Sequence, residues 1–448
     1  MKIFFRHILK TLFITGLSAI FISCTGKAAK TTEKSAVPGN GNSLSQAFMK
    51  AQNSKQSEKE ATDRITFNKE IAIKDTKSKV FTEIKARDAV REMKAGWNLG
   101  NTLDATGYTP TGSLGSKADL SSEISWGQPY TTKAMIDGLA ASGIKTLRIP
   151  ISWSHHIIDP DYTIDPAWMS RVKEIVDWAL EDELYVIINI HHDNYDKNQK
   201  MPPLAGFYPT EENYENSANF VCNIWAQISL AFNNGYDQHL IFEALNEPRL
   251  CGTSEEWYYD TKSEKSLEAM KTLNKLNQDI LDVIRASGGN NKKRLLAFPS
   301  LQASPDSAFA GPFKMPQDYD LSTNRLILSV HMYTPYSFAM QSPGIREYSD
   351  SVKKEFTSIF QRLNDTFISK GYAVYIGEYG ATNKNNLKDR VAWFGDFNRE
   401  ANAFGMPCIL WDNGVWKVEN DDYNEHYGFY NREQQTWYFP DILEAINN

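Results

Sequence analysis

Eight apolar stretches of strand length alternate with helical patterns from about residue 84 onward, and no other feature of the sequence constrains the fold as much. Between them, apolar residues recur every three or four positions in residues 168–180, 218–232, 267–284 and 352–368, as expected of helices that pack on a sheet. Alternation of this kind predicts parallel strands covered by helices. The predicted strands are residues 96–99, 144–149, 184–190, 240–245, 294–298, 326–331, 373–378 and 407–411.

Eight strand–helix units in one chain predict an α/β fold of the (β/α)8 TIM barrel type, whose functional site lies at the carboxyl ends of the strands. With 448 residues and 41% apolar content, the chain can bury one large core. A helix over residues 82–93, before the first strand, is expected to close the floor of the barrel. The alternative is a doubly wound open sheet, but no glycine-rich phosphate loop follows the first strand to support it.

The first 23 residues are typical of an export signal. Basic residues precede an apolar run over residues 11–22, which is too short to span a bilayer comfortably. The sequence FISC that ends at Cys24 resembles a bacterial lipobox, so Cys24 is predicted to carry a lipid anchor. The protein is therefore expected to be an exported lipoprotein of the outer membrane or cell surface. An ordinary secretory signal, which would release the protein to the periplasm or the medium, is the alternative.

The remaining chain divides into a tether and one catalytic domain. Residues 24–62 are rich in Lys, Ser, Thr, Gly and Asn and contain few large apolar residues, so they are predicted to form a flexible tether. Residues 63–448 are predicted to form the barrel.

Polar and aromatic residues stand at the ends of most of the predicted strands. A buried polar group at one strand end would be unremarkable, but polar groups at seven of the eight are hard to explain by packing, because a barrel concentrates stabilising residues at its opposite face. The candidate site residues are Asn98, Asn101, Arg148, His191, His192, Asn246, Glu247, His331, Tyr333, Glu378 and Trp411.

Two of these residues carry the chemistry. Glu247 and Glu378 each end an apolar strand, and a pair of carboxyl groups is what acid/base cleavage of a glycosidic bond requires. The net charge of -7 argues against a nucleic-acid partner. The 11 Trp and 21 Tyr residues suit a carbohydrate partner, although most of them are expected to pack in the core. We therefore predict a polysaccharide-cleaving enzyme that acts as a monomer.

Seven motifs in order along the chain resemble glycoside hydrolase family 5, a family of retaining (β/α)8 glycosidases. The first and last resemble subfamily 4, which holds many bacterial endoglucanases and xyloglucanases. The motifs are GWNLGNTLDA (96–105), TLRIPISW (146–153), NIHHD (189–193), FEALNEP (242–248), HMYTP (331–335), IGEYG (376–380) and LWDNG (410–414).

The resemblance implies a role for each candidate residue. Glu247 corresponds to the general acid/base, Glu378 to the nucleophile and Asn246 to a contact with the substrate 2-hydroxyl. The other substrate-binding positions of the family correspond to Arg148, His191, His331, Tyr333 and Trp411, with His192, Asn98 and Asn101 beside them. The expected activity is endo-acting, retaining β-1,4-glucan hydrolysis by double displacement, without a metal or cofactor.

The two-carboxylate mechanism predicts opposite pKa shifts. Glu378 should titrate low beside Arg148 and Tyr333, whereas burial and the neighbouring charge should raise the pKa of Glu247. Retention requires the two carboxyl groups to lie about 5 to 5.5 Å apart. In addition to Trp411, candidate platforms for neighbouring sugars are Trp126, Trp153 and Trp257.

Three alternatives remain open from the sequence. Residues 155–156 and 191–193, read HH and HHD, suggest a zinc site, although adjacent residues on a strand point to opposite faces and seldom chelate together. A surface glycan-binding lipoprotein without catalysis would use the aromatic residues but would not need both Glu247 and Glu378. An endo-β-1,4-mannanase or xylanase would use the same machinery on a different β-linked polysaccharide.

Overall fold

The computed structural model describes residues 42–106, 119–195, 206–320, 324–419 and 422–448. The predicted signal segment, Cys24 and the first part of the predicted tether therefore lie outside the described residues. The chain divides into two compact units, residues 1–48 and residues 49–448, and the barrel belongs entirely to the second.

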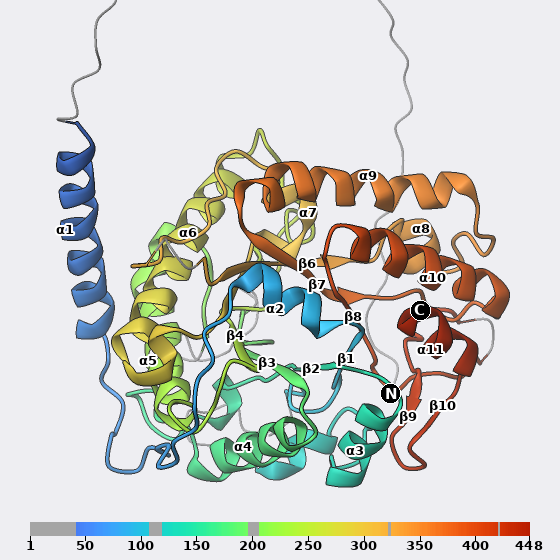
Figure 1. Cartoon of the computed structure of the whole chain (residues 1–448), viewed down its shortest axis with the longest axis horizontal. Coiled ribbons are helices and arrows are strands. Elements are labelled where there is room, and N and C mark those ends of the chain that lie inside the picture. Colours follow the sequence, from blue (N-terminus) through green and yellow to red (C-terminus); the bar gives the residue numbers. More distant parts are fainter. Residues whose placement is uncertain (1–41, 107–118, 196–205, 321–323, 420–421) are drawn as a thin grey trace, which may run out of the picture. The chain divides into compact units, whose positions relative to one another are not determined.

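Eight parallel strands form a closed barrel in sequence order, as the sequence predicts (Figure 1). The barrel closes where β1 pairs with β8 through Gly96–Ile409 and Trp97–Leu410. The observed strands agree with the predicted ranges to within two residues. They are β1 (Gly96–Asn98), β2 (Thr146–Ile149), β3 (Tyr185–Asn189), β4 (Leu240–Glu243), β5 (Leu296–Pro299), β6 (Leu326–Met332), β7 (Ala373–Tyr379) and β8 (Cys408–Leu410).

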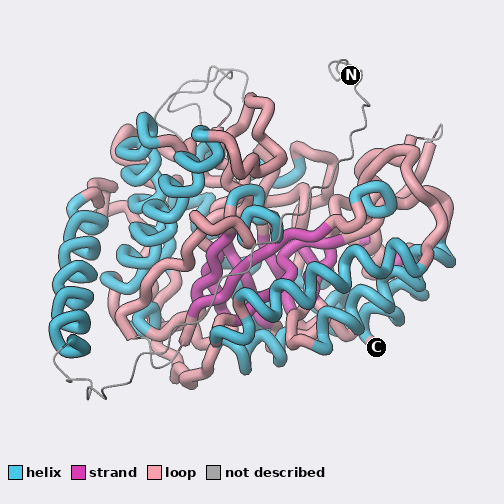
Figure 2. The backbone as a smooth tube through the Cα atoms, turned by 90° about the horizontal axis from the view of Figure 1, so that it is seen from above, coloured by secondary structure: helices cyan, strands magenta, loops and turns pink. Residues whose placement is uncertain are grey.

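Helices surround the strands, which lie at the centre of the second unit (Figure 2). The four predicted covering helices are present as α4 (Pro166–Glu181), α5 (Tyr214–Ala231), α6 (Glu264–Ala286) and α9 (Asp350–Thr366). The other α-helices are α1 (Asn42–Asp63), α2 (Ala86–Met93), α3 (Lys133–Ala141), α7 (Pro305–Ala308), α8 (Tyr336–Ala339), α10 (Leu387–Ala403) and α11 (Pro440–Asn447). Short 3-10 helices are η1 (Leu120–Ile124), η2 (Ser154–His156), η3 (Glu211–Asn213), η4 (Gly289–Lys292), η5 (Leu301–Ala303) and η6 (Ile368–Lys370), and β9 (Tyr430–Asn431) pairs with β10 (Thr436–Trp437) in a hairpin.

Helix α2 closes the barrel floor, as the sequence predicts. Ala86, Ala89, Val90 and Met93 form its buried face, and they belong to one apolar cluster with side chains from the barrel strands. The strand residues of that cluster are Tyr185, Ile187, Ile241, Ala297, Ile327, Ala373, Tyr375 and Ile409. The amino end of the barrel is thus sealed by packing, which leaves the carboxyl ends of the strands for chemistry.

Residues 42–63, in the last part of the predicted tether, form helix α1 (Asn42–Asp63). Within the second unit, the Ser57 hydroxyl in this helix donates to the carboxylate of Asp282 in α6. Just beyond the helix, Arg64 forms an ion pair with Glu215. Composition alone indicates a tether here, but polar contacts with the barrel helices hold this segment. No helix in the described part of the chain is long and apolar enough to cross a membrane.

Strand β7 contains a bulge beside its candidate nucleophile. The pairing of β6 with β7 passes from Val330–Ile376 to His331–Glu378, so Gly377 has no partner residue on β6. A bulge of this kind redirects the following side chain. The Gly377 carbonyl instead accepts a hydrogen bond from the Asn98 amide at 3.0 Å.

Candidate active site

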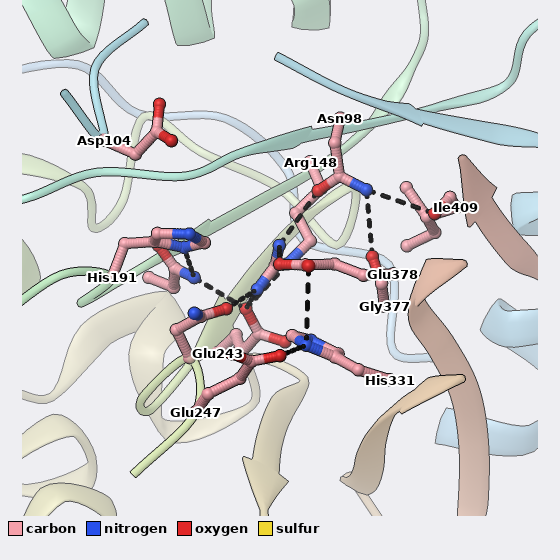
Figure 3. A network of polar contacts seen from close by, with 12 residues as sticks. Asn98, Asp104, Arg148, His191, Glu243, Glu247, His331, Gly377, Glu378 and Ile409 are labelled. Atoms are coloured by element: carbon pink, nitrogen blue, oxygen red, sulfur yellow. Dashed lines mark hydrogen bonds and ion pairs between the residues drawn. The ribbon is translucent and has the colours of Figure 1, made fainter. Parts of the chain in front are cut away.

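The candidate residues from β2, β3, β4, β6 and β7 converge at the carboxyl end of the barrel, where Figure 3 shows their polar contacts. Arg148, which is fully buried, lies at the centre. Its Nη1 donates to Glu378 Oε1 at 2.8 Å and to Asn98 Oδ1 at 2.9 Å. Its Nη2 donates to Asn246 Oδ1 at 2.7 Å.

Glu247 and Glu378 lie close together, on either side of His331. His331 Nδ1 is 2.7 Å from Glu247 Oε1 and 3.7 Å from Glu378 Oε2. Ligand atoms of these three residues all lie within 4.8 Å of one another. The Tyr333 hydroxyl donates to Glu378 Oε2 at 3.0 Å, so both oxygens of Glu378 accept a hydrogen bond. One oxygen of each carboxyl group thus lies close enough for both groups to act on a single bound sugar.

The pKa values of the two carboxyl groups are ordered opposite to the prediction. Burial raises the pKa of Glu378 above its ordinary value, and the charges of His331 and Arg148 only partly offset this. Burial would also raise the pKa of Glu247, but the hydrogen bond and positive charge of His331, together with the charge of Arg249, outweigh it and lower that pKa. The prediction failed because it left out the charge on His331.

His331 is itself perturbed by the two carboxylates. Burial favours the neutral imidazole, but the negative charges of Glu378 and Glu247 and the hydrogen bond to Glu247 outweigh burial and raise the His331 pKa. A protonated His331 Nδ1 would donate to Glu247 Oε1, which lies 2.7 Å away.

Trp411 and His191 lie parallel at the end of the barrel, with ring centroids 6.0 Å apart and an interplanar angle of 2°. The Asn189 amide donates to His191 Nδ1 at 3.1 Å, which leaves the proton of the neutral ring on Nε2. Burial and the neighbouring charges of His192 and Arg148 hold the pKa of His191 well below its ordinary value, so the ring is neutral. The Asn246 side-chain oxygen accepts a hydrogen bond from Arg148, so the amide nitrogen of Asn246 is the atom that can donate to a substrate.

Three predicted substrate contacts are placed differently from the rest. Asn98 is fully buried and donates to the backbone carbonyls of Gly377, Ile409 and Leu410, so it ties β1 to β7 and β8. Asn101 lies in the loop after β1 with a positive φ of 54°, and its backbone N–H donates to Asp104. The His192 side chain is partly exposed beside Trp126, with ring centroids 5.4 Å apart.

Among the described residues, His155 and His156 belong to neither group of side chains with metal-ligand spacing. His156 stacks on Trp168 at 3.6 Å between centroids, and the Asp193 carboxylate accepts the backbone N–H groups of Trp153 and Ser154. Among the described residues, metal-ligand spacing occurs in Asp104, His191 and His192, and in the group around Glu247. Asp104 already accepts two backbone N–H groups, and burial raises its pKa to about 7. The chemistry of that group therefore fits a loop anchor better than a metal site.

The three predicted tryptophan platforms differ in exposure. Trp153 is fully buried and its indole N–H donates to the Asn189 carbonyl at 2.8 Å, so it is a core residue. Trp126 is 39% exposed and Trp257 is 62% exposed. Trp257 lies against the Arg249 guanidinium at 4.2 Å, and Arg249 Nη1 donates to the Glu247 carbonyl, so this ring is near the candidate acid.

One buried carboxylate of the site is absent from the predicted set. Glu243, three residues after Leu240 at the start of β4, pairs with Arg148 through Oε2. A glutamate inside an apolar strand is a usable signal, because a fully buried carboxylate requires a charged or hydrogen-bonding partner.

A closed barrel with a pair of buried carboxyl groups at its carboxyl end, beside a parallel Trp–His pair and an arginine-centred network, defines a glycoside hydrolase. Residues 104–416 match the model of the cellulase family, glycosyl hydrolase family 5. The chain belongs to this family.

Known proteins and structures agree with that assignment. The chain is 40% identical over 367 residues to endoglucanase B of Ruminococcus albus, covering 82% of this chain and 81% of that protein. A family 5 lichenase mutant from Caldicellulosiruptor sp. F32, solved with cellotetraose, is 38% identical with a TM-score of 0.74 and covers 83% of this chain and 97% of its own. A broad specificity GH5-4 endoglucanase from Ruminococcus champanellensis, solved with cellotriose, is 37% identical with a TM-score of 0.74 and covers 83% and 100%.

Proposed function

We propose that this protein is an endo-acting, retaining β-1,4-glucanase, with Glu378 as nucleophile and Glu247 as general acid/base. The observation that carries the proposal is the close approach of these two carboxyl groups, which share His331 within 4.8 Å. Double displacement requires the nucleophile to reach the anomeric carbon while the acid/base reaches the glycosidic oxygen bonded to that carbon.

The hydrogen bonds of Glu378 support its role as the nucleophile. Its two oxygens accept from Arg148 and Tyr333, which fixes the carboxylate and directs it toward a sugar bound against Trp411. Burial and the charge of Glu378 hold the Tyr333 pKa well above its ordinary value, so the phenol keeps its proton and remains a donor. The raised pKa of Glu378 makes the carboxylate a stronger nucleophile whenever it is ionised.

In this proposal Glu247 shares its catalytic proton with His331. The short His331–Glu247 contact lets one proton move between Nδ1 and Oε1, so the pair can protonate the glycosidic oxygen as the bond to the leaving group breaks. Once Glu378 is glycosylated, its negative charge is gone. The leading cause that raises the His331 pKa is then lost, and the Glu247 carboxylate is available to deprotonate the incoming water.

The expected substrate is a β-glucan chain, because relatives with this barrel are named endoglucanases, lichenase and broad specificity endoglucanases. Asn246 is placed to bond the 2-hydroxyl of the sugar beside Glu378, a contact that strengthens as the anomeric carbon becomes positive. The exposed rings of Trp126 and Trp257 would extend the contact to neighbouring sugars. A mannanase or xylanase would use the same two carboxylates with different loop contacts.

The test is release of reducing ends from carboxymethylcellulose, mixed-linkage β-glucan, xyloglucan, mannan and xylan. We expect cleavage of the β-glucans with internal cuts, and an initial product of β configuration by proton NMR. Glu247→Gln and Glu378→Gln should each lower turnover by about 10³-fold or more while the circular dichroism spectrum is unchanged. An α product, a preference for mannan or xylan, or near-normal turnover in either variant would reject the proposal, and binding without cleavage would favour a glycan-binding lipoprotein.

We also propose that the protein is exported and carries lipid on Cys24. The support is the order of basic residues, apolar run and FISC motif in residues 1–24. In cells fed an alkyne-labelled fatty acid, the full-length protein should take up label and remain in the membrane fraction. Cys24→Ala should abolish both. Unlabelled wild-type protein in the medium would instead indicate an ordinary secretory signal.

A further inference from the structure

Glu243 in β4 is a third carboxylate of the site, and it has no access to solvent or substrate. Its Oε1 accepts hydrogen bonds from the Ser329 hydroxyl at 2.6 Å and the Tyr375 hydroxyl at 2.8 Å. Its Oε2 accepts from Arg148 Nε at 2.8 Å and from the Asn189 amide at 2.9 Å. Arg148 Nη2 is also 2.7 Å from Oε2.

Every group that faces Glu243 is a hydrogen-bond donor. Two guanidinium nitrogens, one amide and two hydroxyls converge on its two oxygens, and each of these hydrogen bonds to Glu243 is donated by its partner, so none of them would accept the O–H of a protonated carboxyl. Burial alone would raise the Glu243 pKa, but the charges of Arg148 and His331 and the hydrogen bonds outweigh it. Glu243 is therefore a permanent negative charge beneath the site.

This charge fixes Arg148. Nε and Nη2 of the guanidinium point at Glu243, so the planar group can present only Nη1 and the outer edge of Nη2 to the site. Those two nitrogens bond Glu378 and Asn246. Glu243 also divides the charge of Arg148 between two carboxylates, which keeps Glu378 from being over-stabilised as an anion.

The same carboxylate reaches a second part of the site. The Asn189 amide donates to both Glu243 Oε2 and His191 Nδ1, so it fixes which nitrogen of His191 is protonated and how the ring lies parallel to Trp411. Glu243 thus contacts Arg148, which bonds Glu378 and Asn246 (Figure 3). Through the Asn189 amide, Glu243 also acts on His191.

We propose that Glu243 is the positioning residue of the active site: it sets the orientation of Arg148 and His191 and moderates the charge that Arg148 exerts on Glu378. The inference rests on the proposed function, because its consequence is measured on the glycosylation step.

The experiment compares Glu243→Gln with the matched variant Glu123→Gln. Glu123 is also fully buried, and its oxygens accept from Arg171 Nε, Arg171 Nη2 and the Thr131 backbone N–H, outside the catalytic site. In both variants the new amide N–H₂ group would face N–H or O–H donors where a carboxylate oxygen had accepted from them. Both variants should therefore have a lower free energy of unfolding. In Glu243→Gln alone we expect kcat on an activated aryl β-cellobioside to fall by about 100-fold, with KM changed less than about threefold.

The pH profile separates positioning from a general loss of folding. Without the charge of Glu243, Arg148 acts fully on Glu378, so the acidic limb of kcat/KM should move to lower pH by about one unit. Glu123→Gln should leave this limb unchanged. Glu243→Asp, which keeps the charge, should keep the acidic limb near its wild-type position.

If Glu243→Gln does not fold, Tyr375→Phe carries the test, since it removes one hydrogen bond to Oε1 and keeps the Glu243 charge that pairs with Arg148 and Asn189. It should lower kcat by about fivefold with little change in KM. Wild-type kcat per folded molecule in these variants, or an equal change of kcat and acidic limb in Glu123→Gln, would overturn the inference. Failure of Glu378→Gln to lose activity would instead reject the proposed function.

Discussion

Gly377→Ala is expected to damage both stability and catalysis, because the β7 bulge brings three network side chains against the glycine. A methyl group at this position would lie 3.0 Å from Ser329 Oγ, 3.1 Å from His331 Nε2 and 3.1 Å from the Tyr375 ring. Each contact is a few tenths of an ångström too short, so a neighbour must move. Ser329 and Tyr375 both hold Glu243, and His331 bonds Glu247, so none can move without weakening a hydrogen bond.

The cost can be bounded from known overpacking effects. One additional methyl group in a well-packed core costs about 1 to 3 kcal/mol, and we expect the upper half of this range because the displaced groups are hydrogen-bonded and buried. The same displacement acts on Glu378, the next residue, and on His331. Misplacement of catalytic groups by a fraction of an ångström to one ångström should lower kcat by about 10- to 100-fold.

Gly395→Ala is the matched control. Gly395 lies inside α10, and a methyl group there would meet Ala445 Cβ at an ordinary 3.8 Å. Since alanine restricts the unfolded chain and favours a helix, this variant should gain about 0.5 to 1 kcal/mol with unchanged kcat. Urea unfolding and turnover of an aryl β-cellobioside measure both quantities. Equal stability changes in the two variants, or wild-type kcat in Gly377→Ala, would refute the packing argument.

Other consequences of the site can be measured directly. Because the pKa of Glu378 is raised, kcat/KM should fall as the pH drops through a value above the ordinary glutamate pKa. Because the pKa of His331 is also raised, kcat/KM should fall as the pH rises through a value above the ordinary histidine pKa. A flat pH profile over this span would contradict both shifts. Trp257→Ala should raise KM for polymeric glucan by about tenfold through lost stacking while turnover of an aryl β-cellobioside stays unchanged, and equal effects on both substrates would reject a platform role. Dialysis against a chelator should leave activity unchanged, whereas a loss restored by zinc would revive the metal hypothesis.

The barrel could be predicted from the sequence because its strands are buried on both faces and appear as short, uniformly apolar runs. Helices α3 and α10 are absent from the predicted set although both are present. Helix α1 could not be predicted from composition, because its end is held by polar contacts such as Ser57 with Asp282, which join residues far apart in the sequence.

The candidate site could be predicted where a polar residue stands at or just beyond the end of a predicted strand, and less well where it lies within one, as Glu243 does in predicted strand 240–245. Glu247, Glu378 and Arg148 stand near the ends of their predicted strands, and they lie close together in the structure. Asn98 also stands near a predicted strand end, but its amide donates to the backbone carbonyls of Gly377, Ile409 and Leu410. The pKa order depends on which side chain lies between the two carboxylates, and spacing along the chain carries no such information.

The seam between β1 and β8 joins residues more than 300 positions apart, and the Asn98 amide bridges it to Ile409. We expect such distant pairing to form late in folding, since the chain loses the entropy of closing a long loop before the strand contacts stabilise it. Glu378 lies on β7, the last but one of the barrel strands, and its neighbour Gly377 is held by that same amide. A chain in which β8 has not yet paired with β1 therefore lacks this support, and we expect hydrolytic activity to report that the barrel has closed.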